Sequence, residues 1–570
     1  NFRDTLVAPS SILRNVLVEA NRMFDLTSGA LDPTQQSLEK IWTFSPSGAR
    51  LQDSTDVGKV LFMVGLKKVL EWLRVLVKGF LLLLLFGFAQ DQNQTVDGGA
   101  DKSKEVAWSL QLPNLGSLSS PRATDLNGDG VLDIVIGAGR LEFQTTDTAI
   151  VAINGKSGDI LWKRAAKDQI FGSASLLDIN QDGVEDIVIG GRSATLQAIE
   201  GRSGALLWDF VEANQLKGQI QVNYFNFYNP QLLPDLTEDG IRDLIVSNGG
   251  DVRKQPFDPD RPIGKLLILD ASTGKILQEV TMPDKKEIYH SITLSKHTKV
   301  EDIEVVFGTG GETIGGHLYV ARLEDILAGT LEKAQILAES KANGFIAPAT
   351  WVDLTADGTA DILANAVEGI IYAFDGRTKE QLWKVKLPGT EIYSSPAVGQ
   401  FTPDGIPDVF VNASSGVWPD FTDCHYVMID GAKGKIKYTQ RFGNFQSASP
   451  LVVDNNADGR DEILISDNRQ RIDSQERKTF YTTLSLIDFA QGGIKTDLLT
   501  PLAGNNISST PWIGDLDGDK LLDLVFSHSN NLYHTYSFDG LRINLVKTDI
   551  PIPTPIKWGA YMGSQSNGRN

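Results

Sequence analysis

Residues 125–137 read DLNGDGVLDIVIG, an acidic loop that leads directly into a β-branched apolar run. Oxygen-bearing side chains stand at loop positions 1, 3, 5 and 9, and position 6 is a glycine, which can adopt a positive φ. This spacing directs hard oxygen ligands at one cation, and Ca²⁺ takes about six to eight of them. A helix–loop–helix site would need glutamate at position 12, where this loop has Ile136, so the loop is predicted to precede a strand.

Six further copies of this loop follow, and the repetition predicts several structural Ca²⁺ sites. The copy at residues 400–408 begins with Gln400 and is expected to be weak or empty, while the copy at 515–523 has Lys520 in place of the glycine. The predicted metal ligands are Asp125, Asn127, Asp129, Asp133, Asp178, Asn180, Asp182, Asp186, Asp235, Thr237, Asp239, Asp243, Asp353, Thr355, Asp357, Asp361, Asp454, Asn456, Asp458, Glu462, Asp515, Asp517, Asp519 and Asp523.

Each repeat contains the parts of one propeller blade. A short segment rich in serine and proline comes before the acidic loop, and an apolar strand follows the loop. A third strand then runs into a glycine hairpin, and the fourth strand often carries an aromatic residue, such as Trp162, Trp208 or Trp383. Four antiparallel strands with turn residues at fixed offsets are typical of a β-propeller, so the chain is predicted to be all-β.

The spacing of the loops predicts the number of blades. The interval from Asp235 to Asp353 is 118 residues, about twice each of the other intervals, which are 47 to 61 residues. One blade without an acidic loop is therefore expected within this interval, at residues 291–308, which gives eight blades, with seven as the alternative. Residues 106–110 are expected to add the outer strand of the last blade and so to remove an exposed sheet edge.

The composition excludes several classes of protein. The 570 residues are 41% hydrophobic, enough for a large core, and the formal net charge is −19. Such an acidic chain is not expected to bind nucleic acid. The single cysteine, Cys424, rules out a disulfide framework and a thiolate zinc cluster.

The loop and strand of residues 125–137 resemble the FG-GAP/VCBS family of extracellular propellers, and the hairpins and tryptophans resemble quinoprotein-type eight-bladed propellers. The resemblance covers residues 106–570. It implies Ca²⁺ in the loops and a secreted or surface-exposed protein. It does not imply a particular ligand, because propellers have many functions.

The first 68 residues differ from the rest. The stretch from Phe24 to Thr34, with Trp42 and Phe44, resembles the FAD:protein FMN transferase family. The flavin-binding and metal-binding segments of that family would have to follow, and neither is found downstream. Residues 1–68 are therefore interpreted as a partial, inactive fragment, and no flavin is expected.

The next segment resembles a secretory signal. Basic residues, among them Lys67, Lys68 and Arg74, precede the apolar run at residues 79–89. This pattern is typical of a signal peptide, with a membrane-anchoring helix over residues 69–90 as the alternative, and that segment alone would contact a membrane. Residues 91–105 are expected to be a polar linker. The sequence predicts an exported protein, extracellular, periplasmic or on the cell surface.

Few residues outside the loops suggest chemistry. The aromatic run at residues 223–230 could stack on a flat ligand at the propeller mouth or form a core strand, and residues 251–262 are expected to be a rim loop. The six histidines show no metal-binding or catalytic spacing, and no catalytic residue is assigned. A quinone cofactor would need an adjacent cysteine pair or its equivalent.

These observations favour a monomeric, calcium-loaded propeller that acts as a binding or adhesion module for an extracellular protein or carbohydrate. Two enzyme hypotheses remain open at this point: a propeller that acts on polysaccharides, and FMN transfer by the N-terminal piece. Enzyme activity is uncertain, and a non-enzymatic role is preferred.

Overall fold

The computed structural model describes residues 42–45, 48–51 and 105–570, except 218–222, 252, 255–257, 259, 419 and 553–555. The chain divides into two compact units, residues 1–98 and 99–570. In the first unit, β1 (Trp42–Ser45) pairs with β2 (Gly48–Leu51) as an antiparallel hairpin. The predicted signal segment, the linker and most of the transferase-like stretch lie outside the described residues and stay predictions.

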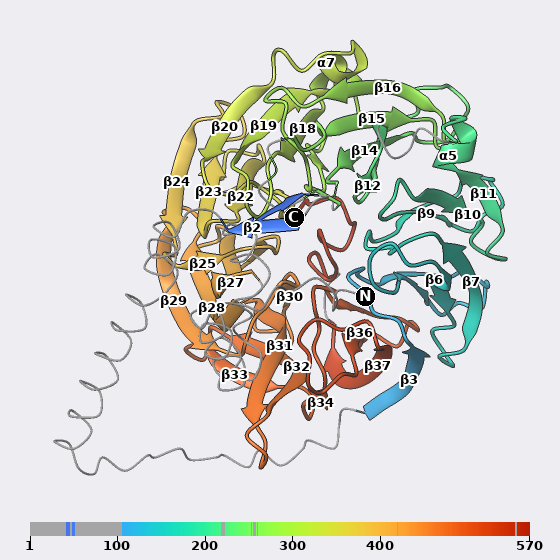
Figure 1. The fold of residues 1–570 in the computed structure, drawn as a ribbon. Coiled ribbons are helices and arrows are strands. Elements are labelled where there is room, and N and C mark those ends of the chain that lie inside the picture. Colours follow the sequence, from blue (N-terminus) through green and yellow to red (C-terminus); the bar gives the residue numbers. More distant parts are fainter. Residues whose placement is uncertain are drawn as a thin grey trace. The chain divides into compact units, whose positions relative to one another are not determined.

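The second unit is an all-β ring of eight antiparallel sheets, as Figure 1 shows. The prediction of eight blades is confirmed, and the seven-bladed alternative is wrong. Blades 1 to 4 consist of β4 (Arg122–Thr124), β5 (Asp133–Gly137), β6 (Thr146–Ile153) and β7 (Ile160–Ala166); β8 (Ser175–Leu177), β9 (Asp186–Gly190), β10 (Leu196–Ile199) and β11 (Leu206–Asp209); β12 (Asn226–Phe227) with β13 (Gln231–Leu232), β14 (Leu244–Gly249), β15 (Lys265–Leu269) and β16 (Ile276–Thr281); and β17 (Thr293–Leu294), β18 (Glu304–Gly308), β19 (Gly316–Arg322) and β20 (Gln335–Ser340).

Blades 5 to 8 continue around the ring, and helices are few and short in the described part of this unit. These blades consist of β21 (Thr350–Val352), β22 (Asp361–Ala366), β23 (Ile370–Phe374) and β24 (Gln381–Lys386); β25 (Thr390–Glu391) with β26 (Ala397–Gly399), β27 (Asp408–Val417), β28 (Asp420–Asp430) and β29 (Lys435–Phe442); β30 (Leu451–Val453), β31 (Glu462–Ile472), β32 (Lys478–Asp488) and β33 (Ile494–Asp497) with β34 (Leu502–Ala503); and β35 (Trp512–Gly514), β36 (Leu521–Ser529), β37 (Gly540–Pro551) and β3 (Glu105–Pro113). The helices are α5 (Phe210–Ala213), α7 (Leu323–Leu327) and the 3₁₀ helix η2 (Val300–Asp302).

Strand β3 closes the ring. It pairs antiparallel with β37, with Trp108 opposite Leu545, and so gives the last blade its outer strand from the start of the propeller (Figure 1). The predicted blade without an acidic loop is also present, as β17 to β20, and η2 takes the place of the loop between its first two strands.

The core lies between neighbouring sheets. The second strand of each early blade is a run of β-branched residues buried on both faces, such as DIVIG in β5 and β9. Val135 and Ile150 of the first blade pack in one cluster with Ile187 and Ile189 of the second. Burial on both faces explains why these strands are continuous apolar runs without the alternation of a half-exposed strand.

Tryptophans on four outer strands connect their blades to the next blade. The indole Nε1 atoms of Trp108, Trp162, Trp208 and Trp383 each donate a hydrogen bond of 2.7 Å to a backbone carbonyl oxygen in the hairpin of the following blade. In three of these hairpins that residue is the glycine of the motif found in the sequence, and the ring also covers the second hairpin glycine. The aromatic position predicted from the sequence is therefore a contact between blades.

The chain ends inside the ring, where residues 556–570 bind to first strands of several blades (Figure 1). Val452 N donates to Trp558 O at 3.0 Å, and Trp351 N donates to Gly568 O at 2.7 Å. The Trp558 side chain is 1% exposed. This C-terminal segment thus fills part of the central channel and connects blades that are distant in sequence.

Candidate functional site

A cavity of about 620 Å³ opens at one end of the central channel. Most of its lining residues come from two sets of segments: those before a first strand, such as Tyr289 and Tyr393, and those after a second strand, such as Arg192 and Trp418; Tyr561 of the C-terminal segment also lines it. Because the first two strands of a blade are antiparallel, these segments share one end of the ring, and the acidic loops between the two strands lie at the opposite end. We call this cavity the funnel.

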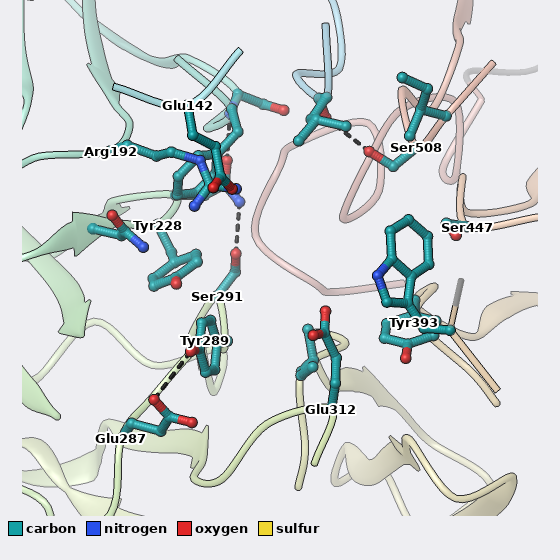
Figure 2. Close-up of a pocket in the computed structure, with 18 of the residues that line it drawn as sticks. Glu142, Arg192, Tyr228, Glu287, Tyr289, Ser291, Glu312, Tyr393, Ser447 and Ser508 are labelled. Atoms are coloured by element: carbon teal, nitrogen blue, oxygen red, sulfur yellow. Dashed lines mark hydrogen bonds and ion pairs between the residues drawn. The ribbon is translucent and has the colours of Figure 1, made fainter. Parts of the chain in front are cut away.

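Two ion pairs line one side of the funnel, one of them partly exposed and the other buried; Figure 2 shows Arg192, Glu142 and Glu287. Arg192 pairs with Glu142 at 2.8 Å, and Arg261 pairs with Glu287 at 2.8 Å. The Tyr289 hydroxyl donates to the Glu287 carboxylate at 3.0 Å and also contacts the Arg261 guanidinium. Burial raises the pKa of Glu287 although Arg261 opposes this shift. Each pair fixes the positions of its two side chains, and the opposite charges within a pair largely cancel.

Aromatic residues form the other side. Tyr393 and Trp418 meet edge to face with ring centroids 6.4 Å apart, and Trp418 meets Tyr536 at 5.7 Å. The Glu391 carboxylate accepts hydrogen bonds from the Tyr393 hydroxyl at 2.7 Å and from the Trp418 backbone N–H at 3.0 Å. The rings are therefore held in place by a buried carboxylate behind them.

Glu312 extends from the loop after β18 into the open centre of the funnel, between the rings of Tyr289 and Tyr393 (Figure 2). Within the described part of the chain, its carboxylate forms no ion pair or hydrogen bond with another side chain. Glu312 is exposed to the cavity, yet desolvation by the surrounding walls raises the pKa of its carboxyl, and the nearby charge of Glu391 adds to the rise. The funnel therefore presents one carboxylate without a counter-ion.

A belt of hydrogen bonds around the channel supports the funnel walls. It consists of the residues before first strands, where each backbone N–H or side-chain amide donates to the side chain of the next blade. Its bonds are Thr510 N to Ser120 Oγ, Ser120 N to Ser173 Oγ, Ser173 N to Asn229 Oδ1, Asn229 Nδ2 to Ser291 Oγ, Ser395 N to Ser449 Oγ and Ser449 N to Thr510 Oγ1, at 2.5–3.0 Å. This belt explains the serines that several repeats carry before the first strand.

The acidic loops have the turn geometry that their sequence predicts. In the first loop, Asp125 Oδ1 accepts from Gly128 N at 2.7 Å, and Asp125 Oδ2 accepts from Gly130 N at 3.0 Å. Gly130 has φ +83°, and open space surrounds the position of a Cβ there. The first-position carboxylate thus fixes the loop by itself, and its role as a metal ligand stays a prediction.

The ninth-position acids are buried and bound to the backbone. Asp186 accepts from Ile179 N at 2.9 Å and Asn180 N at 3.2 Å within its loop, and from Gly201 N at 2.8 Å in the hairpin. The ninth residue also accepts backbone N–H groups in the other six loops. Each of these acids therefore fastens its loop, and metal binding by them stays a prediction.

One loop brings its carboxylates together. Ligand atoms of Asp515, Asp517 and Asp523 lie within 4.8 Å of one another, the one such group of acids, histidines or cysteines among the described residues. The Lys547 ammonium contacts Asp517 and lowers the pKa of that carboxyl. The last loop therefore has a cation of its own from the neighbouring strand.

Sequence analysis identified only some of the residues that line the funnel. Of the aromatic run at residues 223–230, Tyr224 and Phe227 are buried in the core, while Tyr228 lines the funnel together with Asn226 and Asn229. The predicted rim loop at residues 251–262 contributes Arg253, Lys254 and Arg261. Sequence analysis missed Arg192, Glu287, Tyr289, Glu312, Tyr393 and Trp418. One sequence pattern could have identified three aromatic residues of the funnel wall. Phe171, Tyr289 and Tyr393 each stand two residues before a belt residue.

Comparisons with known proteins agree with this fold. Residues 93–313 match the family model described as outer membrane protein assembly factor BamB. No curated protein matches the chain. Among solved structures, a europium-containing methanol dehydrogenase has a TM-score of 0.51 at 11% identity, covering 78% of this chain and 93% of that one. A quinohaemoprotein alcohol dehydrogenase from Comamonas testosteroni has a TM-score of 0.51 at 11% identity, covering 80% of this chain and 78% of that one.

The second unit therefore has a quinoprotein-like propeller fold, as the hairpins and tryptophans indicated. The prediction of a calcium-loaded binding or adhesion module is wrong, because the family match and the similar folds are of BamB and quinoprotein type. The FG-GAP/VCBS and FMN transferase resemblances stay predictions.

The residues of the funnel do not fit the quinone cofactor and metal that the names of these dehydrogenases imply. Cys424 is fully buried in β28 and has no cysteine beside it. Within the described residues, the three carboxylates that converge on one point are those of the Asp515 loop, at the opposite end of the ring. We therefore assign no redox step to the funnel.

Proposed function

We propose that this protein is an exported, non-redox relative of the quinoprotein propellers that binds a small organic ligand in the funnel. The observation that carries this proposal is the funnel itself: a cavity of about 620 Å³, lined by aromatic rings and preset polar groups, at the mouth of a rigid ring. Ligand sites are typically concave, largely preformed and lined by aromatic residues with a few polar groups. The hydrogen-bond belt and the ion pairs supply this preorganisation.

Some residues of the funnel would contact the ligand, and others hold those residues in place. Tyr228, Tyr289, Tyr393 and Trp418 offer ring faces and edges, while Glu287 and Glu391 hold the tyrosine hydroxyls from behind. Trp418 is 37% exposed, so a ligand in the funnel would cover apolar surface that is now in water. No catalytic residue is assigned.

The experiment is a thermal-shift screen of the full chain against a library of small metabolites, with a blocked funnel as the control. Ser447 lines the funnel, is partly exposed, and its hydroxyl forms no hydrogen bond among the described residues. The Ser447→Trp variant should fill the cavity and abolish the shifts, whereas Ser447→Ala should keep them. Shifts that persist in Ser447→Trp would place the ligand elsewhere and refute the proposal.

We also propose that acidic loops with Asp at position 1 bind Ca²⁺ and stiffen the end of the ring opposite the funnel. The support is the repeated spacing of oxygen ligands and the loop turns described above. Lys547 is expected to replace the ion in the last loop, because its ammonium already contacts Asp517. Export is proposed from the BamB-type family match and from the signal-like segment at residues 69–90.

A further inference from the structure

More carboxylates than cationic side chains surround the funnel. Arg192 and Arg261 are each paired with a glutamate at 2.8 Å, Arg253 with Asp251 at 2.7 Å, and Lys254 with Asp258 at 3.5 Å. Glu312 and Glu391 form no ion pair with any lysine, arginine or histidine of the described residues. Two carboxylates close enough to influence each other therefore lie at the aromatic side of the funnel without a counter-ion.

The surroundings of these carboxylates are aromatic. Glu391 is 6% exposed and holds the Tyr393 hydroxyl and the Trp418 backbone. The Glu312 carboxylate reaches between the rings of Tyr289 and Tyr393 (Figure 2). Its negative charge also contributes to the raised pKa values of Tyr393 and Tyr536, so those hydroxyls lie within its field.

From this arrangement we propose that the ligand of the funnel carries an organic ammonium group, which binds beside Glu312 against the rings of Tyr289, Tyr393 and Trp418. This inference rests on the proposed ligand-binding function. Glu312 is an exposed residue within this cavity, and its carboxylate attracts a cation that enters the funnel. Aromatic faces attract the same cation through their quadrupole, most strongly for tryptophan.

An alkylammonium fits better than a metal ion. A divalent metal requires several oxygen ligands that converge on one point, and Glu312 belongs to no such group in the described chain. Substituents of an ammonium group can instead contact the ring edges, while its charge stays near the carboxylate. Arg192 and Arg261 partly oppose the rise that desolvation causes in the pKa of Glu312 and would repel the cation, but each is paired with its own glutamate.

The test uses isothermal titration calorimetry of the full chain with choline and phenyltrimethylammonium, and with 3,3-dimethylbutanol as the uncharged isostere of choline. The two cations should bind, and the neutral isostere should bind at least about tenfold more weakly. The variant Glu312→Gln should weaken the cations by about tenfold and leave the neutral isostere unchanged. Because Glu312 is exposed and its carboxylate pairs with no other side chain of the described residues, the variant is expected to fold as well as the wild type.

The matched control is Glu185→Gln, the same substitution on an exposed side chain in an acidic loop at the opposite end of the ring. It should bind the cations as the wild type does. Equal binding of cations by wild type and Glu312→Gln would overturn the inference, and so would competition by CaCl₂ that NaCl at equal ionic strength does not reproduce. Neutral or anionic compounds that bind in the funnel while both cations fail would refute the inference and leave the proposed function standing. A funnel that binds nothing in either experiment would refute both.

Discussion

The indole Nε1 of Trp162, on the outer strand of the first blade, donates a 2.7 Å hydrogen bond to the carbonyl oxygen of Gly201 in the second blade. The N–H of the same glycine donates to the Asp186 carboxylate at 2.8 Å. One hairpin glycine thus connects the docking tryptophan of one blade to the acidic loop of the next. The same arrangement of tryptophan, glycine and aspartate recurs at Trp108 and Trp383.

The first prediction concerns this hydrogen bond. Trp162→Phe keeps an aromatic ring but leaves the buried Gly201 carbonyl without its donor. An unsatisfied buried polar group costs about 1–3 kcal/mol, so the free energy of unfolding should fall by that amount. Chemical denaturation of both proteins measures the difference. Leu161→Ala, at the exposed neighbouring position, should change little, and a Trp162→Phe variant as stable as wild type would show that the indole bond contributes nothing.

The second prediction separates close packing from backbone strain at two glycines. Gly204 has φ +73°, and a Cβ there would lie 2.7 Å from ring atoms of Trp162. Gly183 has φ +85°, with nothing within 4 Å of the same position. Gly183→Ala should therefore cost about 1 kcal/mol from the left-handed backbone alone, and Gly204→Ala clearly more, because the tryptophan must move. Thermal melting compares the two, and equal losses would contradict the packing argument.

The third prediction separates the two acids of one loop. Asp186→Asn replaces an oxygen acceptor by an N–H₂ group that opposes backbone N–H donors, so it should lower the melting temperature with or without Ca²⁺. Asp178 is at the half-buried first position, where solvent can replace a lost acceptor, so Asp178→Asn should act mainly by removing the calcium-dependent part of the stability. Melting curves in CaCl₂ and in EDTA measure both effects. An unchanged wild-type melting temperature in EDTA would refute calcium binding by the loops.

The fourth prediction concerns acid stability. Asp497 is partly buried beside Arg469 and Lys495, and although burial opposes it, these cations lower its pKa from 3.8 to about 2. A lowered folded-state pKa stabilises the protein above the unfolded value, and this contribution is lost as the pH falls from about 3.8 to about 2. Asp497→Asn should cost at most about 1 kcal/mol at pH 7, since the pair is partly exposed.

Denaturation of wild type and Asp497→Asn at pH 7 and at pH 2 tests whether the ionised Asp497 carboxylate stabilises the folded protein. The two proteins should differ at pH 7 and agree at pH 2. A difference that grew toward pH 2 would mean that the carboxyl is stabilised in its neutral form. Asp159→Asn, which removes a hydrogen bond of an exposed turn away from these cations, serves as the control.

The sequence predicted the ring but only part of its binding site, for a physical reason. The blade number and the docking tryptophans depend on contacts that recur in several blades, so the chain repeats them, and Trp108 shows the same pattern in the strand that closes the ring. Glu312 and Trp418 lie in loops that differ from blade to blade, and they come to line one cavity only when eight blades close. The repeated acids also misled the functional interpretation, because the ninth-position residues such as Asp186 have a task within each blade that requires no adhesion partner.

The last prediction concerns the segment inside the channel. Trp558 is 1% exposed, and its backbone accepts from Val452 N of the seventh blade. Trp558→Ala should leave a large cavity where blades meet and cost about 3–5 kcal/mol, whereas Trp558→Phe should cost less. Because Tyr561 of the same segment lines the funnel, the alanine variant should also weaken small-molecule binding in the thermal-shift screen. Trp418→Ala removes an exposed tryptophan and should affect binding without this loss of stability. Loss of stability without any change in binding would show that the segment supports the ring alone.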